Sequence, residues 1–425
     1  MKVRDTVKNY ESERRMYANY VFRSVKKVCK EVGARGAGSP EELKAQEWMQ
    51  DDLKTTCDEV RIEPFTVHPR AFMSWIQILV VCSSLAGVLA FVSQFFADFA
   101  KPMLIAAAVL IVVGFAFALV EFLFYKEIID PFTKKATSHN LIAVRKPSGE
   151  VKRRIIFAGH ADSAMEWRFT YWGGRKMVAA VTVISLLGAL LVLAFSIVNL
   201  IFAFTGNFEG NTVVKILSII SVCFVPLFIF CILFYDPKKF VEGANDNLTG
   251  CFISMAMPRY LSDHDIRLEN TEVWAVCTGS EESGLRGSKA FASAYAKQFA
   301  DEKDVETVFV AVDTVRDFEH MCIYGKDMTG LVKHSGEACA LVTAGAKLAG
   351  YDIANNSVWL GATDAAAATQ AGIKATAFAA MDPAPAKYYH TRLDTHENMD
   401  LKAIEAGVDI CLNTMFLFDE SGLNV

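Results

Sequence analysis

Four apolar stretches constrain the fold of this chain more than any other feature. They cover residues 72–96, 103–125, 177–204 and 216–235. Each holds roughly 20 to 28 residues, enough for a helix to cross a hydrocarbon core about 30 Å thick. Uninterrupted apolar runs of this length are rare in the cores of soluble proteins. We therefore expect four transmembrane helices, and the alternative is four buried core helices.

The four spans form two hairpins, 72–125 and 177–235, because the turn within each pair is too short to be a domain. Lys and Arg are enriched in the cytoplasmic loops of membrane proteins. On the side shared by the termini, the spans are flanked by Arg70, Lys126, Lys134, Lys135, Arg175, Lys176, Lys238 and Lys239. The turns offer Lys101 and Lys215. This asymmetry predicts both turns outside, and both termini with all the polar sequence in the cytoplasm.

Composition excludes several other classes. The net charge is −5 and no basic block is present, so we expect no nucleic-acid partner. Ten cysteines are scattered without a CxxC spacing, which favours a reducing compartment. The first 40 residues are charged, and 11–32 is predicted to be an amphipathic helix, so no signal peptide is expected. Within the spans, Glu121 is assigned to the interface, and no paired charges suggest a transporter.

Without the hairpins, 1–71, 126–176 and 236–425 remain, which suits one discontinuous α/β domain. Strands are predicted at "EVRIEPFTV" (an edge strand), "NLIAV", "RRIIFAGH", "EVWAVC", "TVFVAVD", "SVWLG" and "KATAFAAM". Helices are predicted at "CFISMAMPRYL", "GEACALVTAGAKLAG" and "DAAAATQAG". Their alternation indicates a largely parallel, twisted sheet with helices on both faces. A further helix begins with Ser39 as N-cap, Pro40 at its first position and Glu42 as capping-box partner.

Chemistry-bearing side chains gather where such folds place their sites, at the ends of strands. Each predicted strand end or adjoining turn supplies one or two of them, namely His160, Asp162, Asp246, Glu281, Glu282, Asp313, His390 and Asp394. Any one of these motifs occurs by chance. Together they supply two imidazoles and several carboxylates, and the adjacent Glu281 and Glu282 repel each other unless a cation is present. The set predicts a dinuclear metal site.

Histidine with carboxylate ligands suits zinc with a water in the open position. Such a pair needs a bridging carboxylate, terminal ligands for each ion, and one unligated carboxylate to accept a proton from the water. The sequence offers five ligands and one base, although these requirements alone do not assign the roles.

The motifs "IIFAGHADS", "GANDNLTG", "SEESGLRGS", "FVAVDTV" and "YYHTRLDT" stand in an order that resembles one known family. This is the co-catalytic dizinc aminopeptidase family of bacterial leucyl aminopeptidase, with glutamate carboxypeptidase II and glutaminyl cyclases as more distant relatives. The resemblance implies a zinc-exopeptidase-like fold and two Zn²⁺ ions, for which Co²⁺ or Mn²⁺ can substitute. It implies an aminopeptidase that removes N-terminal residues from peptides.

The resemblance also assigns roles to single residues. It implies Asp246 as the bridging ligand, Glu282 and His390 on one zinc, and His160 and Asp313 on the other. Glu281 matches the general base, and Asp162 would orient His160, with Asp394 as the equivalent for His390. The peptide bond after Asp246 is expected to be cis. Tyr389 is a candidate to polarise the scissile carbonyl.

The chain departs from the family in two places. "GATDAAAATQAGIKA" holds alanines and Lys374 where the family usually has His, Phe and Pro, which leaves the specificity pocket open. The hairpins are absent from soluble members, and the second lies between His160 and Asp246. We therefore expect the catalytic mouth near the bilayer and a peptide substrate that is hydrophobic or membrane-associated. The oligomeric state is left open.

Two alternatives use the same fold. One is a glutaminyl cyclase-like enzyme, which generally uses a single zinc, and the presence of Asp313 in a complete set of ligands argues against it. The other is an inactive membrane scaffold or receptor. Inactive members have usually lost ligands or the base, and this chain retains all of them.

Overall fold

The computed structural model describes residues 3–358, 361–384 and 386–425. The chain folds into two units, and each is assembled from separate segments. Unit 1 comprises Met1–Pro69, Lys134–Glu166 and Lys238–Val425, and unit 2 comprises Arg70–Thr133 and Trp167–Pro237.

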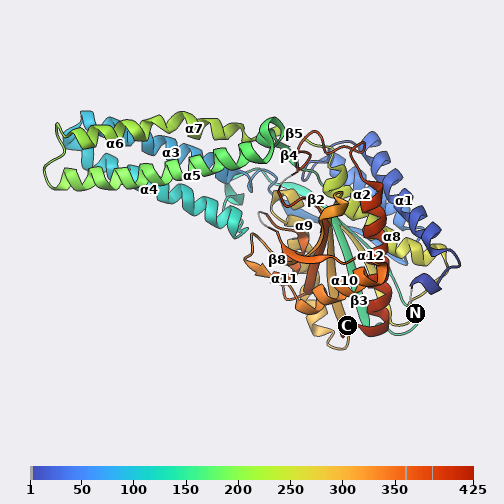
Figure 1. Ribbon diagram of the computed structural model, residues 1–425. Coiled ribbons are helices and arrows are strands. Elements are labelled where there is room, and N and C mark those ends of the chain that lie inside the picture. The colour runs from blue at the N-terminus through green and yellow to red at the C-terminus, as the bar shows by residue number, and fades with distance from the viewer. Residues whose placement is uncertain (1–2, 359–360, 385) are drawn as a thin grey trace. The chain divides into compact units, whose positions relative to one another are not determined.

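A nine-stranded sheet, counted over the described residues, forms the centre of unit 1 (Figure 1). The strand order is β1-β2-β6-β3-β7-β11-β8-β10, and β9 pairs with β8. The strands are β1 (Glu59–Val67), β2 (Ala136–Arg145), β3 (Arg153–His160), β6 (Thr271–Thr278), β7 (Glu306–Val315), β8 (Met321–Asp327), β9 (Val332–Lys333), β10 (Ala354–Ser357) and β11 (Lys374–Ala380). A separate two-stranded sheet pairs β4 (Met165–Trp167) with β5 (Tyr235–Phe240).

The centre of the large sheet is parallel. β6, β3, β7 and β11 run in one direction, whereas β2 pairs antiparallel with β6 and β8 antiparallel with β11. β1 lies at the edge, as its alternating sequence predicted. The predicted mixed, largely parallel sheet is therefore confirmed. Its parallel strands bring their carboxyl ends to one edge, which is where such sheets place their sites.

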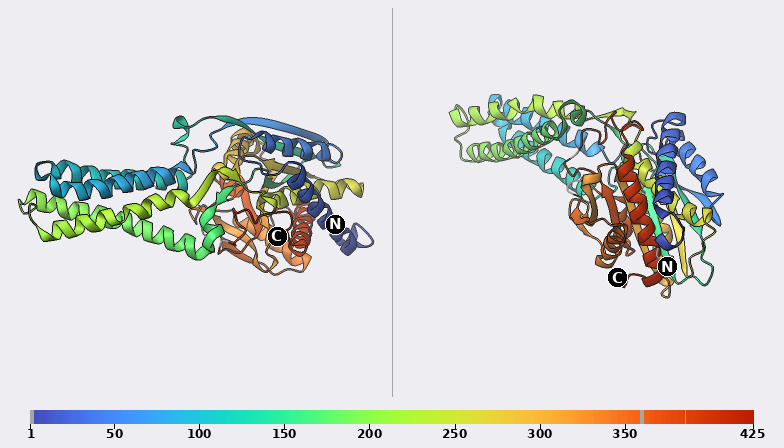
Figure 2. Two further views of the ribbon diagram at one scale, coloured as in Figure 1. Left: turned by 90° about the horizontal axis from the view of Figure 1, so that it is seen from above. Right: turned by 45° about the vertical axis from the view of Figure 1, so that its right-hand side comes forward.

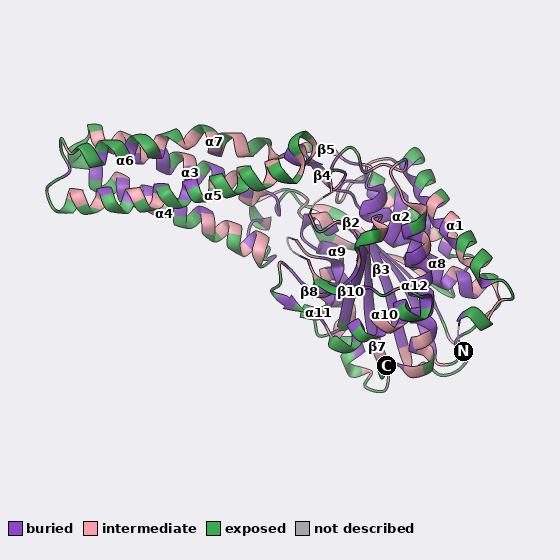
Figure 3. Ribbon diagram, viewed as in Figure 1, coloured by how far each residue is buried: buried purple, intermediate pink, exposed green. Residues whose placement is uncertain are grey.

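Helices cover both faces of the sheet, and two apolar cores result. Along β3, Ile155 and Phe157 point into one core, and Ile156 and Ala158 point into the other. The first core is covered by α1 (Tyr10–Glu31), α2 (Pro40–Leu53), α8 (Thr249–Asp263), α10 (Gly336–Ala349) and α12 (Leu401–Ser421). The second is covered by α9 (Arg286–Asp301) and α11 (Asp364–Gln370). Figure 3 shows the strands as almost entirely buried between these layers.

Several local predictions differ from the structure. Ser39 caps α2 by accepting a hydrogen bond from the Glu42 amide at 3.2 Å, and α2 begins at Pro40, as predicted. The predicted capping box is wrong, because the Glu42 carboxylate accepts from the Gly38 amide instead of returning to Ser39. "SVWLG" falls partly outside the described residues. Strand β8 and helix α12 were not predicted.

Unit 2 consists of apolar helices that run side by side (Figure 2). They are α3 (Ser74–Val92), α4 (Ala100–Phe117), α5 (Arg168–Phe204), α6 (Thr212–Cys223) and α7 (Val225–Phe230). With their short extensions they form four helices long and apolar enough to cross a membrane by length and composition, within the part of the chain that the structure describes.

The boundaries of two of these helices depart from the apolar runs. α5 begins at Arg168, ahead of the predicted start at 177, and it is kinked at Gly174, whose φ is 58°. The last helix is interrupted between α6 and α7, where Pro226 stands at the start of α7. Proline lacks an amide proton and clashes with the preceding turn, so it accounts for the break between α6 and α7.

Candidate metal centre

The predicted site residues converge at the carboxyl edge of the central strands. His160 is the last residue of β3 and pairs in register with Thr278, the last residue of β6. Glu281 follows in the short helix η8 (Glu281–Ser283), and Asp313 lies near the end of β7. These strands are adjacent and parallel, so the side chains that end them meet at one edge.

Two further site residues come from segments outside the long helices and strands. Asp246 lies in η7 (Ala244–Leu248), directly before α8, and His390 lies between β11 and α12. His160 Nε2 lies 3.1 Å from Asp246 Oδ1, and His390 Nε2 lies 3.1 Å from Asp246 Oδ2. Asp246 thus contacts one histidine with each carboxylate oxygen.

Two overlapping groups of possible ligands result. His160, Asp246 and Asp313 present one donor atom each within 4.8 Å of one another, and so do Asp246, Glu282 and His390. His390 Nε2 is 3.1 Å from Glu282 Oε1. The two groups share Asp246, which is the arrangement that a bridging carboxylate between two ions requires.

Glu281 belongs to neither group. Its Oε2 lies 3.9 Å from His160 Nε2, and it forms a third cluster of possible ligands with His160 and Glu282. The Glu281 carboxylate therefore lies beside the two ligand groups and can accept a proton.

Burial dominates the electrostatics of these carboxylates. It raises the pKa of Glu281 well above the ordinary value and also raises that of Glu282. Burial and the charge of Asp246 raise the pKa of Asp313 to about 7. Burial also acts on Asp246, but hydrogen bonds with His160 and His390 outweigh it and lower the pKa of that carboxyl.

The histidines are affected in the opposite way. Although burial works against the charged imidazole, the carboxylates of Glu282 and Asp246 raise the pKa of His390 to about 10. More carboxylates than imidazoles are crowded into a buried space, so the set has an excess of negative charge. Divalent cations favour such a site, and imidazole with carboxylate oxygens is a donor set that zinc accepts. The residues present therefore fit a pair of zinc ions.

Asp162 supports the glutamate pair as well as a histidine. Its Oδ1 lies 3.5 Å from His160 Nδ1, consistent with the orienting role predicted for it. The same oxygen accepts the Glu281 amide at 2.9 Å, and Oδ2 accepts the Glu282 amide at 3.1 Å. This buried carboxylate therefore fixes the backbone of both glutamates, which the sequence alone did not indicate.

The peptide bond between Asp246 and Asn247 is cis, as the resemblance implied. Asn247 anchors this turn, since its Nδ2 donates to the Val312 carbonyl at 2.9 Å and its Oδ1 accepts the Gly250 amide at 3.0 Å. Gly250 is required here: a Cβ at that position would lie 2.0 Å from the Val312 oxygen. The start of α8 is thus held directly against β7.

Sequence reasoning missed three residues around the site. Arg35 is fully buried and donates to the carbonyl oxygens of Ala161 and Gly243 at 2.7 and 3.0 Å. Glu42 accepts the Ser280 amide at 2.6 Å. Asp364 accepts a 2.6 Å hydrogen bond from the Thr278 hydroxyl. Glu42 and Asp364 both lie in the first turn of a helix, and the local sequence gives no sign of their contacts with the strand ends.

The comparisons with known proteins agree with this geometry. Residues 234–415 match the model of peptidase family M28. The matched segment, a little under half of the chain, is similar to peptidase family M28. The match begins one residue before β5 and includes Asp246, Glu281, Glu282, Asp313 and His390. No curated protein matches the chain in sequence.

Solved structures share the fold over most of the chain. The aminopeptidase from Aneurinibacillus sp. strain AM-1 is 17% identical, with 94% of this chain and 93% of that chain covered and a TM-score of 0.51. The zinc aminopeptidase of Bacillus subtilis is 14% identical, with 94% of each chain covered and a TM-score of 0.54. A glutaminyl cyclase from Fimbriiglobus ruber is 15% identical, with 94% and 95% covered and a TM-score of 0.55. At these identities the likeness concerns the fold alone.

Proposed function

We propose that this chain is a membrane-anchored dizinc aminopeptidase that removes N-terminal residues from peptides. The observation that supports it best is the pair of ligand groups that share Asp246. His160 and Asp313 would hold one zinc, Glu282 and His390 the other, and Asp246 both. A complete set of five ligands favours a two-metal hydrolase over a single-zinc cyclase and over an inactive scaffold.

The residues of the site have separate tasks in this proposal. Zinc ions bound there would polarise the scissile carbonyl and lower the pKa of a coordinated water. Glu281 accepts the proton of the attacking water, and it later returns this proton to the leaving amine. Its position beside His160, outside both ligand groups, suits a base that must not be a ligand. Asp162 keeps His160 and the two glutamates in place.

The membrane part of the proposal is supported by the surface of unit 2. Its helices carry many exposed and half-buried residues, which are green and pink in Figure 3, and many of the exposed ones are large and apolar. Val109, Leu187 and Ile201 are 53%, 55% and 58% exposed. Such continuous apolar surface is rare on soluble proteins and is normal against lipid. The Lys/Arg bias supports both termini and unit 1 in the cytoplasm.

The proposed substrate is a hydrophobic or membrane-associated peptide. The chain leaves unit 1 after Glu166, six residues beyond His160, and it returns at Lys238, eight residues before Asp246. The second apolar hairpin is thus inserted between two proposed ligands of one site. Peptides that partition to the membrane surface would reach such an enzyme at a raised local concentration.

Peptide hydrolysis followed by mass spectrometry tests the proposal. Full-length protein purified in detergent is given unblocked and N-acetylated versions of the same apolar and polar peptides, with and without a zinc chelator. We expect stepwise loss of N-terminal residues from the unblocked peptides alone, abolished by chelation and restored by zinc, with apolar peptides cut faster. Cleavage of acetylated peptides contradicts the aminopeptidase assignment, and absence of both cleavage and bound metal supports the scaffold. Equal rates on apolar and polar peptides remove the membrane-substrate argument.

A further inference from the structure

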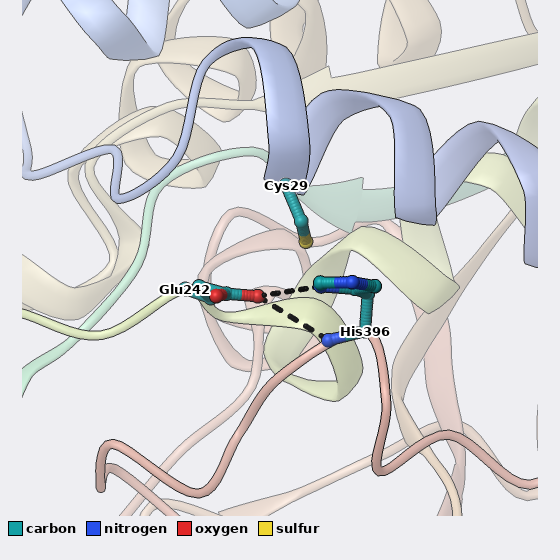
Figure 4. A group of neighbouring side chains, drawn as sticks. All are labelled: Cys29, Glu242 and His396. Carbon is teal, nitrogen blue, oxygen red and sulfur yellow. Dashed lines mark hydrogen bonds and ion pairs between the residues drawn. The ribbon is translucent and has the colours of Figure 1, made fainter.

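A second group of metal-ligand side chains lies outside the candidate metal centre. Cys29 on α1, Glu242 after β5 and His396 before α12 present a sulfur, an oxygen and a nitrogen within 4.8 Å of one another. Figure 4 shows the Cys29 side chain extending from its helix toward the other two residues. The three come from distant parts of the sequence, and all belong to unit 1.

His396 and Glu242 already contact each other. The Nδ1 atom of His396 lies 3.1 Å from Glu242 Oε2, and the backbone amide of His396 donates to the same oxygen at 3.3 Å (Figure 4). Nitrogen and oxygen ligands bound tetrahedrally to zinc at about 2.0–2.1 Å are themselves roughly 3.3 Å apart. The observed separation therefore needs little adjustment to accept an ion.

The donor set is selective for zinc-like cations. A thiolate, an imidazole and a carboxylate together are preferred by zinc and cobalt, whereas magnesium and calcium prefer oxygen ligands alone. Cys29 is buried, while the side chains of His396 and Glu242 are 14% and 33% exposed. Solvent can therefore supply a fourth ligand, and an ion has a route to the site.

The surrounding charges suit one divalent cation. Burial raises the pKa of the Cys29 thiol to about 12; the charge of Arg35 lowers it, and the carboxylates of Glu242 and Asp394 raise it. The Arg35 guanidinium also donates to the Glu242 carbonyl at 2.7 Å. The thiol is therefore neutral without a metal, and a bound divalent cation would displace its proton, so that the thiolate and the Glu242 carboxylate would together balance the charge of one ion.

We propose that Cys29, Glu242 and His396 bind a third zinc ion with a structural role. Glu242 precedes Asp246 by four residues, and His396 follows His390 by six. The ion would tie α1 to both segments that carry these proposed catalytic ligands. This inference does not depend on peptidase activity.

Cobalt substitution tests the proposal in the full-length protein. Chelator-stripped protein in detergent is titrated with Co²⁺, and the thiolate-to-cobalt charge-transfer absorption in the near ultraviolet is followed. The candidate metal centre consists of histidines and carboxylates, so it contributes no sulfur absorption. We expect a band with the final intensity of one cobalt–thiolate bond per chain, which disappears on addition of zinc and is lost in Cys29→Ser. Cys57→Ser, which changes another unit 1 cysteine, should keep it.

A second variant covers the possibility that Cys29→Ser does not fold. His396→Gln changes a partly exposed side chain, and it should weaken the cobalt affinity followed by this absorption band by more than about tenfold. Loss of a residue that only positions a metal ligand typically costs about 10–100-fold in affinity, and loss of a ligand should cost at least as much. Absence of the band in the unchanged protein overturns the third site, as does a band that persists in Cys29→Ser or unchanged affinity in His396→Gln. Loss of hydrolysis with the band intact would instead overturn the proposed peptidase function.

Discussion

Asp394 holds the backbone of Asp246, because its Oδ2 accepts the Asp246 amide at 3.1 Å. The other oxygen accepts the backbone amide and the side-chain amide of Asn245 at 2.8 and 2.7 Å. Three donors therefore converge on one fully buried carboxylate. This arrangement fixes the segment that presents the proposed bridging ligand. The predicted contact of Asp394 with His390 stays a prediction.

We expect Asp394→Ala to weaken zinc binding by roughly 10–100-fold, as the loss of a residue that positions a ligand commonly does. The substitution leaves the Asn245 and Asp246 amides without this acceptor, so Asp246 is less well oriented. Zinc affinity is measured by competition with a chromophoric chelator. Asp304→Ala, at an exposed position, is the matched control and should bind like the unchanged protein. Equal affinity in Asp394→Ala contradicts the positioning role.

Glu281→Gln should lower kcat by roughly 10²–10⁴-fold, the usual contribution of a general base. The amide cannot accept the proton of the attacking water, but it preserves the size of the side chain. The zinc content per chain should equal that of the unchanged protein, measured by elemental analysis beside the rate. Glu282→Gln is the informative comparison, since it should lose metal first. Hydrolysis at the unchanged rate in Glu281→Gln would assign the base elsewhere.

The positions of His160 and Asp313 could be predicted from the sequence because two simple rules coincide there. The apolar runs before them identify buried strands, and parallel strands bring their carboxyl ends together. Neither rule applies to Glu42, whose hydrogen bond to Ser280 joins residues 238 positions apart in the sequence. The local pattern around Glu42 suggested a capping box, and the tertiary contact replaced it.

The bounds of the apolar helices could likewise be predicted only in part. Hydropathy detects where the apolar residues lie, so it placed the third helix from 177 onward. The structure starts α5 at Arg168, because a short helical segment that precedes the kink at Gly174 is joined to the apolar run, and hydropathy does not detect that segment. The cis peptide after Asp246 could be predicted from the resemblance alone, since no local sequence rule favours a cis bond before Asn.

Removal of the metals should make stability depend on pH in a defined direction. Burial, assisted by the charge of Asp246, raises the pKa of Asp313 and of Asp394 to about 7. Unfolded aspartate titrates near pH 4, so between about pH 4 and 7 the folded chain holds protons that the unfolded chain has lost. Stability therefore falls as the pH rises through this window.

Thermal unfolding of chelated protein checks this expectation. Tm should be lower at pH 8 than at pH 5, and Asp313→Asn should reduce the difference, because the amide carries no charge at either pH. Zinc favours the deprotonated ligands, so the gain in Tm on adding zinc should be larger at pH 8. A Tm of the chelated protein that rises with pH, or a slope unchanged in Asp313→Asn, contradicts the assignment.

Val109→Asp separates a membrane helix from a soluble one. Val109 is 53% exposed within α4, so a carboxylate there would be tolerated, and would even improve solubility, if that surface faced water. Against lipid it should disfavour insertion by about 2.5–3.5 kcal/mol at the helix centre. We expect much less of the Val109→Asp variant to stay in the membrane fraction after alkaline extraction, whereas Val109→Leu should remain there.

Lys101→Asp, at the start of the same helix, should have a smaller effect because interfacial charges remain hydrated. Recovery of Val109→Asp in the membrane fraction at the unchanged level would mean that α4 does not need an apolar environment. That result would contradict the membrane-anchor proposal. It would not affect the proposed metal centre of unit 1.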